Sequence, residues 1–290
     1  MAVTSENHAS EVSRGDRFEF GKNWAKFLEL LTDARIENAK KSLCEFLELS
    51  SLAGKTFVDV GSGSGLFSLA ARMLGAKVHS FDFDPKSVAC TAELKRRYFP
   101  NDPDWTIAEA SALDRSYLQT LGTFDVVYSW GVLHHTGAMW QALDNVHSLV
   151  KPGGLLFVAI YNDQGGWSRR WTKLKKGYNR SPRFLKTPYA LATMLPRELA
   201  TAMVAAARFS FGAYVRTWRS QSNSPRGMDK WRDIVDWIGG YPFEVAKPEQ
   251  IFQFFRDRGF DLRMLRTCGA GLGCNEFVFT RRSQDHSPAK

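Results

Sequence analysis

The 290-residue sequence is poor in cysteine and has no long uncharged apolar run. Its four cysteines, Cys44, Cys90, Cys268 and Cys274, lack a paired CxxC spacing, which argues against a zinc site and a disulfide framework. The nearest approach to a membrane span, residues 190–215, is interrupted by proline and by charged residues. The polar N-terminus has no apolar core of the kind that a signal peptide needs. We therefore expect a soluble, cytoplasmic protein that holds no metal.

The sequence also lacks internal repeats and low-complexity tracts. With 44% hydrophobic and 24% charged residues, it is neither a disordered chain nor a collagen-like one. Its length suits one large domain, or one domain that carries a sizeable insertion. Shifts in composition predict a disordered tail (1–15), N-terminal helices that cap the ligand site (16–53), an α/β core (54–162 and 247–283), a helical insertion (163–246) and a C-terminal tail (284–290).

Short apolar runs alternate with helical patterns through the expected core. The runs predict strands at 56–60, 77–83, 105–110, 124–130, 155–161, 261–268 and 276–282. Intervening stretches such as 66–74 and 85–98 have the apolar spacing of helices. This alternation predicts a mostly parallel sheet with helices on both faces, and such sheets bind ligands at the carboxyl ends of their strands.

Three glycines follow the first predicted strand in the stretch VDVGSGSG (58–65). Glycine lets the backbone turn sharply there and lets a ligand approach it without a Cβ in the way. Dinucleotide-binding enzymes use a similar turn, but Leu66 occupies the position of their third glycine. The turn therefore predicts a nucleotide-like ligand without deciding which one.

Two acidic residues favour one ligand over the other. Asp59 lies two residues before the first glycine, where a carboxylate repels a pyrophosphate and suits a cationic ammonium. Asp82 ends the second predicted strand, where an acid accepts hydrogen bonds from ribose hydroxyls, and Phe83 after it can pack on adenine. S-adenosylmethionine (SAM) carries an amino group, a sulfonium and no phosphate. The charges therefore favour SAM over a nicotinamide dinucleotide.

These residues, and the segments that follow them, resemble the class I SAM-dependent methyltransferases. The resemblance covers about residues 56–161 and 248–282, through the motifs VDVGSGSG, HSFDFDP, FDVVYSWGVLHHT and LVKPGGLLFVAIY. It implies a seven-stranded, mostly parallel, Rossmann-like α/β sheet with helices on both faces and a basic helical insertion after strand 5. It also implies SAM as the cofactor and S-adenosylhomocysteine as the product.

The resemblance assigns cofactor-binding residues by their position in these motifs. Asp59 and the glycines hold the methionine part, and Asp82 holds the ribose. The family often has an Asp that binds the adenine amino group, where this sequence has Ser111 and, next to it, the backbone N–H of Ala112. The expected cofactor-binding residues are Asp59, Gly61, Ser62, Gly63, Asp82, Phe83, Ser111, Ala112 and Ser129.

Candidate residues for the methyl acceptor follow the fourth and fifth predicted strands. In an in-line displacement from a sulfonium, the enzyme mainly supplies alignment and desolvation. An oxygen acceptor must also lose a proton, so His134 is the first candidate base, ahead of His135, with Tyr161 as a phenolic proton relay. Packing roles for the histidines and a helix cap at Asn162 are the alternatives. The expected substrate-binding residues are Trp130, Asn162, Trp167, Arg170, Tyr241, Glu244 and Asn275.

Positive charge is concentrated in the expected insertion. Residues 164–238 contain 15 Lys and Arg against 4 Asp and Glu, an excess of 11, whereas the whole chain carries +9. We expect a lid over the acceptor pocket that meets an anionic acceptor, a nucleic acid or a membrane surface, unless the insertion is only a solvated helical subdomain. The segment 18–27 either closes over the cofactor or packs on the sheet.

Three functions remain open on the sequence alone. The first is methylation of a small molecule, with oxygen as the expected acceptor atom and a bulky, anionic or lipid-linked acceptor, as in quinone and natural-product biosynthesis. The second is a tRNA-modifying, wobble-uridine type methyltransferase, for which the basic insertion would contact phosphates. The third is a SAM-binding protein without turnover. The sequence does not determine the oligomeric state.

Overall fold

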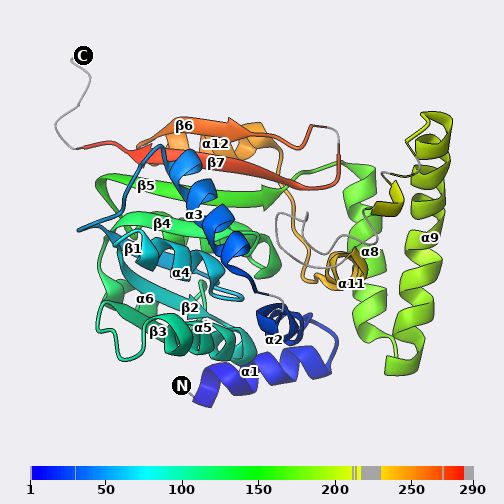
Figure 1. Ribbon diagram of the computed structural model, residues 1–290, viewed down its shortest axis with the longest axis horizontal. Helices are drawn as coiled ribbons and strands as arrows, with labels where there is room; N and C mark the ends of the chain where they lie inside the picture. Colours follow the sequence, from blue (N-terminus) through cyan, green and yellow to red (C-terminus); the bar gives the residue numbers. More distant parts are fainter. Residues whose placement is uncertain are drawn as a thin grey trace.

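The computed structural model describes residues 2–29, 31–210, 212, 214–216, 230–269 and 271–283 (Figure 1). These residues form a seven-stranded sheet with the order β3-β2-β1-β4-β5-β7-β6. β7 runs antiparallel to both of its neighbours, whereas the β1–β2, β1–β4, β2–β3 and β4–β5 pairs are parallel. The expected α/β fold class is confirmed. The strands are β1 (Thr56–Val60), β2 (Lys77–Asp82), β3 (Trp105–Glu109), β4 (Phe124–Trp130), β5 (Val150–Tyr161), β6 (Phe260–Arg266) and β7 (Cys274–Arg281).

Helices cover both faces of the sheet. The two faces have separate cores because neighbouring residues of a strand point to opposite sides, so that Phe57 packs on one face and Val58 on the other. On the first face lie α3 (Asp33–Leu47), α4 (Leu66–Met73) and α5 (Pro85–Tyr98). On the second face lie α6 (Arg115–Leu121), α7 (Met139–His147) and α12 (Pro248–Arg256). Both cores hold the strands so that the carboxyl ends of β1, β2 and β4 meet at one edge.

The insertion after β5 is helical, as the sequence indicates. It contains α8 (Gly166–Arg180), α9 (Arg183–Ala207) and α11 (Lys230–Gly239). Figure 1 places these helices beyond the ends of the strands, with α9 outermost. A small core of its own, built around Tyr178, Ala190 and Ile238, holds them together.

The N-terminal segment differs from the expectation. Residues 1–15 were expected to be disordered, but α1 (Ala2–Ser13) is a helix, followed by α2 (Gly21–Glu29). The polar sequence of α1 gives no helical apolar spacing, and tertiary contacts hold it instead: His8 is buried near Asp84, and Glu11 is ion-paired with Arg17. The C-terminal tail expected at 284–290 lies outside the described residues.

Candidate functional site

A cavity of about 300 Å³ opens at the carboxyl ends of β1, β2 and β4. Its wall combines the glycine turn after β1, the end of β2, the loop after β4 and residues from the N-terminal segment. The volume is at the lower end of the range for small-molecule sites. The cavity is therefore the candidate site for a small-molecule ligand.

The glycine turn forms one wall. Gly61 has a φ of 81°, and a Cβ built on it would lie 2.3 Å from a methyl carbon of Val132. Gly63 has a φ of 55°, and its Cβ would lie 3.2 Å from the indole of Trp24. Left-handed backbone and close neighbours both require glycine here. The turn is thus shaped by the loop after β4 and by α2, as well as by any ligand.

Asp82 fixes two backbone turns at once. Its Oδ2 accepts a hydrogen bond from the N–H of Gly63 at 2.9 Å, and its Oδ1 accepts one from the N–H of Asp84 at 2.9 Å. The carboxylate lines the cavity. Asp82 therefore holds the glycine turn in register with the end of β2.

Asp59 ends a chain of buried hydrogen bonds. The indole Nε1 of Trp105 donates to the hydroxyl of Ser80 at 2.9 Å, and Ser80 donates to Ser68 at 2.7 Å. Ser68 donates in turn to Oδ2 of Asp59 at 2.5 Å. Each residue of this chain is buried. The chain fixes the orientation of a carboxylate that lines the cavity.

Burial makes both acids reluctant to ionise. It raises the pKa of Asp59 to about 7, and the charge of Asp82 adds to the rise. It raises the pKa of Asp82 to about 6, against the hydrogen bonds from Asp84 and Gly63. A cation between them would stabilise both carboxylates. The cavity therefore suits a positively charged ligand.

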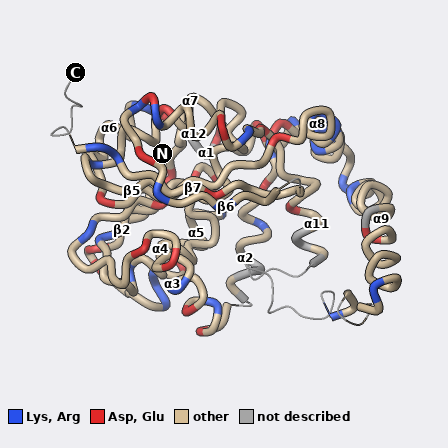
Figure 2. Tube along the Cα trace, turned by 90° about the horizontal axis from the view of Figure 1, so that it is seen from above, with Lys and Arg blue, Asp and Glu red and all other residues tan. Residues whose placement is uncertain are grey.

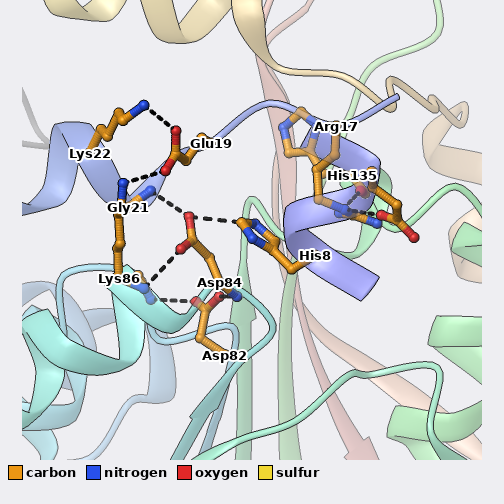
Figure 3. A network of polar contacts seen from close by, with 11 residues as sticks. His8, Arg17, Glu19, Gly21, Lys22, Asp82, Asp84, Lys86 and His135 are labelled. Atoms are coloured by element: carbon orange, nitrogen blue, oxygen red, sulfur yellow. Dashed lines mark hydrogen bonds and ion pairs between the residues drawn. The ribbon is translucent and has the colours of Figure 1, made fainter. Parts of the chain in front are cut away.

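The N-terminal segment closes over this end of the cavity (Figure 3). Asp84 accepts a hydrogen bond from the N–H of Gly21 at 2.8 Å, and its Oδ2 lies 3.7 Å from Nε2 of His8. Arg17 donates to the carbonyl of His135 at 2.9 Å, and its guanidinium lies 4.8 Å from the ring centre of Phe83. The segment thus spans from the end of β2 to the loop after β4. Phe18, Phe20 and Trp24 also line the cavity.

Most of the predicted cofactor-binding residues come together. Those that line the cavity are Asp59, Gly61, Ser62, Gly63, Asp82, Phe83, Ser111 and Ala112. Ser129 does not line it, because its buried hydroxyl donates to the carbonyl of Val60 at 3.0 Å and so ties β4 to β1.

The two histidines are placed differently. Both lie in the short helix η1 (Leu133–His135), but only His135 lines the cavity. His134 is fully buried, and its Nδ1 accepts a hydrogen bond from the N–H of Tyr161 at 3.3 Å. Nδ1 of His135 lies 2.6 Å from the carbonyl of Pro242. A carbonyl only accepts, so Nδ1 carries the proton and Nε2 is the basic nitrogen of the neutral ring. The geometry thus favours His135 over His134, the reverse of the order expected from the sequence.

Aromatic and charged groups also line the cavity. Tyr161 lines it, with its ring between His134 and Phe243. Trp130 also lines it, and its indole donates to Oε1 of Glu276 at 2.6 Å. Arg266, whose guanidinium lies 4.2 Å from the ring centre of Phe46, is a further lining residue. These residues therefore give the cavity apolar surface with a few polar groups.

Six of the predicted substrate-binding residues do not line the cavity, namely Asn162, Trp167, Arg170, Tyr241, Glu244 and Asn275. Four of them make contacts that hold the fold, and two lie at the surface of α8. Asn275 donates to Asn162 at 3.1 Å, and the pair joins β7 to the end of β5. The carbonyl of Tyr241 accepts from Phe18, and the carboxylate of Glu244 accepts from the N–H of Met139 at the start of α7. The surface pair is Trp167 and Arg170 on α8, with the guanidinium 4.8 Å from the ring centre.

Several residues that line the cavity were not among the site residues expected from the sequence. Asp236 of α11 lines the cavity and accepts a hydrogen bond from Asn23 of α2, so α11 is the insertion helix that reaches the site. Arg17, Arg266 and Glu276 are charged residues without a motif, and only the tertiary fold brings them here. Within the part of the chain that the structure describes, no cluster of three or more His, Cys, Asp and Glu side chains is arranged to hold a metal ion.

Comparison with known proteins identifies relatives of the core. Residues 58–156 match a family model described as a methyltransferase domain. Over 163 residues the chain is 28% identical to the mitochondrial ubiquinone biosynthesis O-methyltransferase of Schizosaccharomyces pombe, which covers 53% of this chain and 56% of that protein. Over 110 residues it is 36% identical to the tRNA U34 carboxymethyltransferase of Klebsiella pneumoniae, covering 37% of this chain and 31% of that protein.

The chain therefore spans about half or less of the length of these curated relatives. Among solved structures, PKMT2 from Rickettsia typhi in complex with AdoHcy matches with a TM-score of 0.54 at 13% identity, over 86% of this chain and 53% of that chain. A match at this identity concerns the fold alone.

Proposed function

We propose that this chain, which belongs to the class I SAM-dependent methyltransferases, transfers a methyl group from SAM to an oxygen of a small-molecule acceptor. The observation that carries the proposal is one cavity lined by the acids Asp59 and Asp82 together with His135 and Tyr161. A cofactor and an acceptor that meet in this cavity would be shielded from water by the N-terminal segment.

The acids Asp59 and Asp82 and the glycine turn fit SAM. The two buried carboxylates suit its positive charge, and the glycine turn leaves backbone exposed to a ligand on the cavity side. Asp82 would hold the ribose, and Asp59 with the glycine turn would hold the methionine part. Ser111 and Ala112, which line the cavity, would contact the adenine. Phe83, which packs under Arg17, would bound the same site.

Bound SAM supplies a methyl group on a sulfonium, which is already reactive towards an oxygen nucleophile. The chain's own residues then have two tasks, which are to align the acceptor and to remove its proton. His135 is the base in this proposal, because its Nδ1–H is held by Pro242 and its Nε2 is the nitrogen that accepts a proton. Tyr161 and Trp130 would orient the acceptor.

The cavity wall narrows the class of acceptor. Phe18, Phe20, Trp24, Tyr161 and Trp130 favour a bulky acceptor with an aromatic or apolar body. The exposed cations of α8 do not line the cavity, so the anionic acceptor expected from the basic insertion draws no support from them.

The test is turnover with methyl-labelled SAM. The purified protein is incubated with a set of phenols, catechols and an extract of small metabolites, and both label transfer and S-adenosylhomocysteine are measured. We expect equal amounts of both products, and a decrease in both in Asp82→Asn. Asp261→Asn, at an exposed carboxylate on β6, is the matched control. Binding of SAM without product from any acceptor would leave a SAM-binding protein without turnover and would overturn the proposal.

A second candidate is a tRNA acceptor. It is favoured by the identity to a tRNA U34 carboxymethyltransferase and by the exposed Arg169, Arg170 and Lys173 of α8. Neutralising phosphates releases counterions, so tRNA binding through these residues must weaken steeply with salt. Salt-independent, weak binding of tRNA would remove this candidate.

A further inference from the structure

The outer face of α9 is a long apolar surface. Its exposed residues Phe184, Leu191, Leu195, Leu199 and Met203, here called the α9 stripe, have between 48% and 77% of their surface accessible. They are spaced by seven, four, four and four residues, which places them on one side of a helix. A contiguous exposed apolar face of this kind is rare on an isolated protein and indicates an interaction site.

The opposite side of α9 holds it against the rest of the insertion. Ala190 and Met194 are buried, and the hydroxyl of Tyr189 donates to the carbonyl of Leu174 in α8 at 2.9 Å. Tyr178 of α8 belongs to the same small core. The orientation of the helix is therefore fixed by packing, and the α9 stripe is left facing outwards.

Charge is scarce along α9 and dense beside it. From residue 187 to residue 207 the sequence has only Arg197 and Glu198 as charged residues, and the carboxylate of Glu198 accepts a hydrogen bond from Tyr214. On the neighbouring α8, Arg169, Arg170 and Lys173 are exposed. Figure 2 shows Lys and Arg on α8, next to α9. The insertion thus combines an apolar helix face with a basic neighbour.

We propose that the α9 stripe docks this protein on the surface of an anionic lipid bilayer. Apolar side chains on one face and cations beside it are the features that bind a helix in the interface of a membrane with acidic headgroups. The exposed Trp167 on α8, stacked by Arg170, is an aromatic residue of the kind found at that interface. This inference is independent of the proposed methyl transfer.

Two other occupants fit less well. A second copy of the chain would bring a second insertion with an excess of 11 positive charges against the first, and the like charges would repel. A nucleic acid would contact the cations but would gain nothing from leucine and methionine side chains. An anionic bilayer would contact both the apolar side chains of the α9 stripe and the cations of α8.

The helix would lie along the membrane rather than cross it. In the described residues, no helix is both long enough and apolar enough to span a bilayer. The 25 residues of α9 correspond to a length of about 37 Å, along which the α9 stripe runs. Because α9 and α8 pack with α11, which contributes Asp236 to the cavity, docking would hold the cavity close to the bilayer.

The experiment measures co-sedimentation of the full chain with vesicles. The probes are vesicles of phosphatidylcholine alone and of phosphatidylcholine mixed with phosphatidylserine. We expect binding to the mixed vesicles, and a loss of about a thousandfold in the triple variant Leu191→Gln, Leu195→Gln, Leu199→Gln, from about tenfold for each leucine. Leu265→Gln, at an exposed leucine on β6, should bind like the parent chain.

A second variant pair tests the charges. Arg169→Gln with Lys173→Gln should weaken binding to the mixed vesicles about fivefold per charge and leave binding to phosphatidylcholine unchanged. Lys41→Gln, at an exposed lysine of α3, is the matched control. Circular dichroism melting of each variant separates loss of binding from loss of folding.

Three outcomes would overturn the proposal. The first is a folded triple variant that sediments with mixed vesicles as well as the parent chain does. The second is a parent chain that does not sediment with them. The third is a parent chain that forms a dimer in analytical ultracentrifugation while the triple variant is a monomer, which would make the α9 stripe an interface between copies.

Discussion

Asp82 accepts hydrogen bonds from the backbone of Gly63 and of Asp84, so its removal affects the glycine turn and the end of β2 together. In the proposed function it also accepts from the ribose. Asp82→Ala should weaken SAM binding about a hundredfold or more, because each charge-assisted hydrogen bond contributes about 1.5–3 kcal/mol. Asp82→Asn keeps one acceptor oxygen, so its affinity for SAM should lie between that of the parent chain and that of Asp82→Ala. Isothermal titration calorimetry measures this, and unchanged affinity in Asp82→Ala would exclude the ribose role.

His134 and His135 are neighbours in the sequence, and their surroundings predict different effects of the same substitution. His135→Gln should lower kcat strongly while the Kd of SAM stays near that of the parent chain, and the acidic limb of the pH–rate profile should disappear. His134→Gln removes the acceptor of the Tyr161 N–H in a buried position and should lower the melting temperature instead. Steady-state kinetics with thermal melting separates the two, and a parent-like kcat in His135→Gln would remove it as the base.

The acids could be predicted from the sequence, and the choice between the histidines could not. Asp59 and Asp82 occupy fixed positions relative to a strand end, where the parallel sheet determines the direction of the side chain. His134 and His135 lie in a short helix, where consecutive side chains point in different directions. Which one faces the cavity depends on Tyr161 and Pro242, which are distant in the sequence. Tertiary contacts of this kind leave no local pattern.

At the scale of elements, the N-terminal segment lies over the cavity and is held by contacts to the end of β2 and to the loop after β4. Arg17 pairs with Glu11, donates to the carbonyl of His135 and lies over Phe83, a cavity residue. Arg17→Gln should loosen this segment and weaken SAM binding about tenfold through faster dissociation. Arg14→Gln is the matched control, because Arg14 is exposed and its side chain pairs with the nearby Asp16. Equal dissociation rates in stopped-flow measurements would show that the segment does not govern ligand release.

Elements with an apolar pattern were predicted better than elements held by polar contacts. The strands and the helix 85–98 follow the apolar spacing of the sequence closely. In contrast, α1 depends on buried polar contacts such as His8 with Asp84, and α6 is a short helix that begins at the cap residue Asp114. The insertion was correctly expected to be helical, but its charge indicated a basic lid over the pocket. The helix that reaches the cavity is α11, through Asp236.

At the scale of the whole molecule, the ionised form of one acid stabilises the fold, whereas the ionised form of an acid that lines the cavity destabilises it. Asp125, which accepts hydrogen bonds from Thr56 and Lys151, has a pKa lowered to about 2 and stabilises the fold in its ionised form. Burial raises the pKa of Asp59 to about 7, so its ionised form destabilises the fold. A site that is ready for a cation therefore lowers the stability of the ligand-free protein.

The pH dependence of Asp59→Asn tests this balance. A carboxyl group whose pKa is raised on folding binds protons more tightly in the folded state, so its contribution to stability is complete below the unfolded pKa of 3.8 and is lost as the pH rises to about 7. Asparagine cannot ionise, and its amide oxygen can still accept from Ser68. The melting temperature of Asp59→Asn minus that of the parent chain should therefore increase between pH 4 and about pH 7 and stay constant above it. Subtracting the two curves cancels the contributions of other acids such as Asp125.

Added SAM should raise the melting temperature of the parent chain more than that of the variant, because only the parent chain offers the second carboxylate. A difference that does not change with pH would mean that Asp59 is already ionised at little cost in the folded protein, and the electrostatic basis of the proposed cofactor site would be lost.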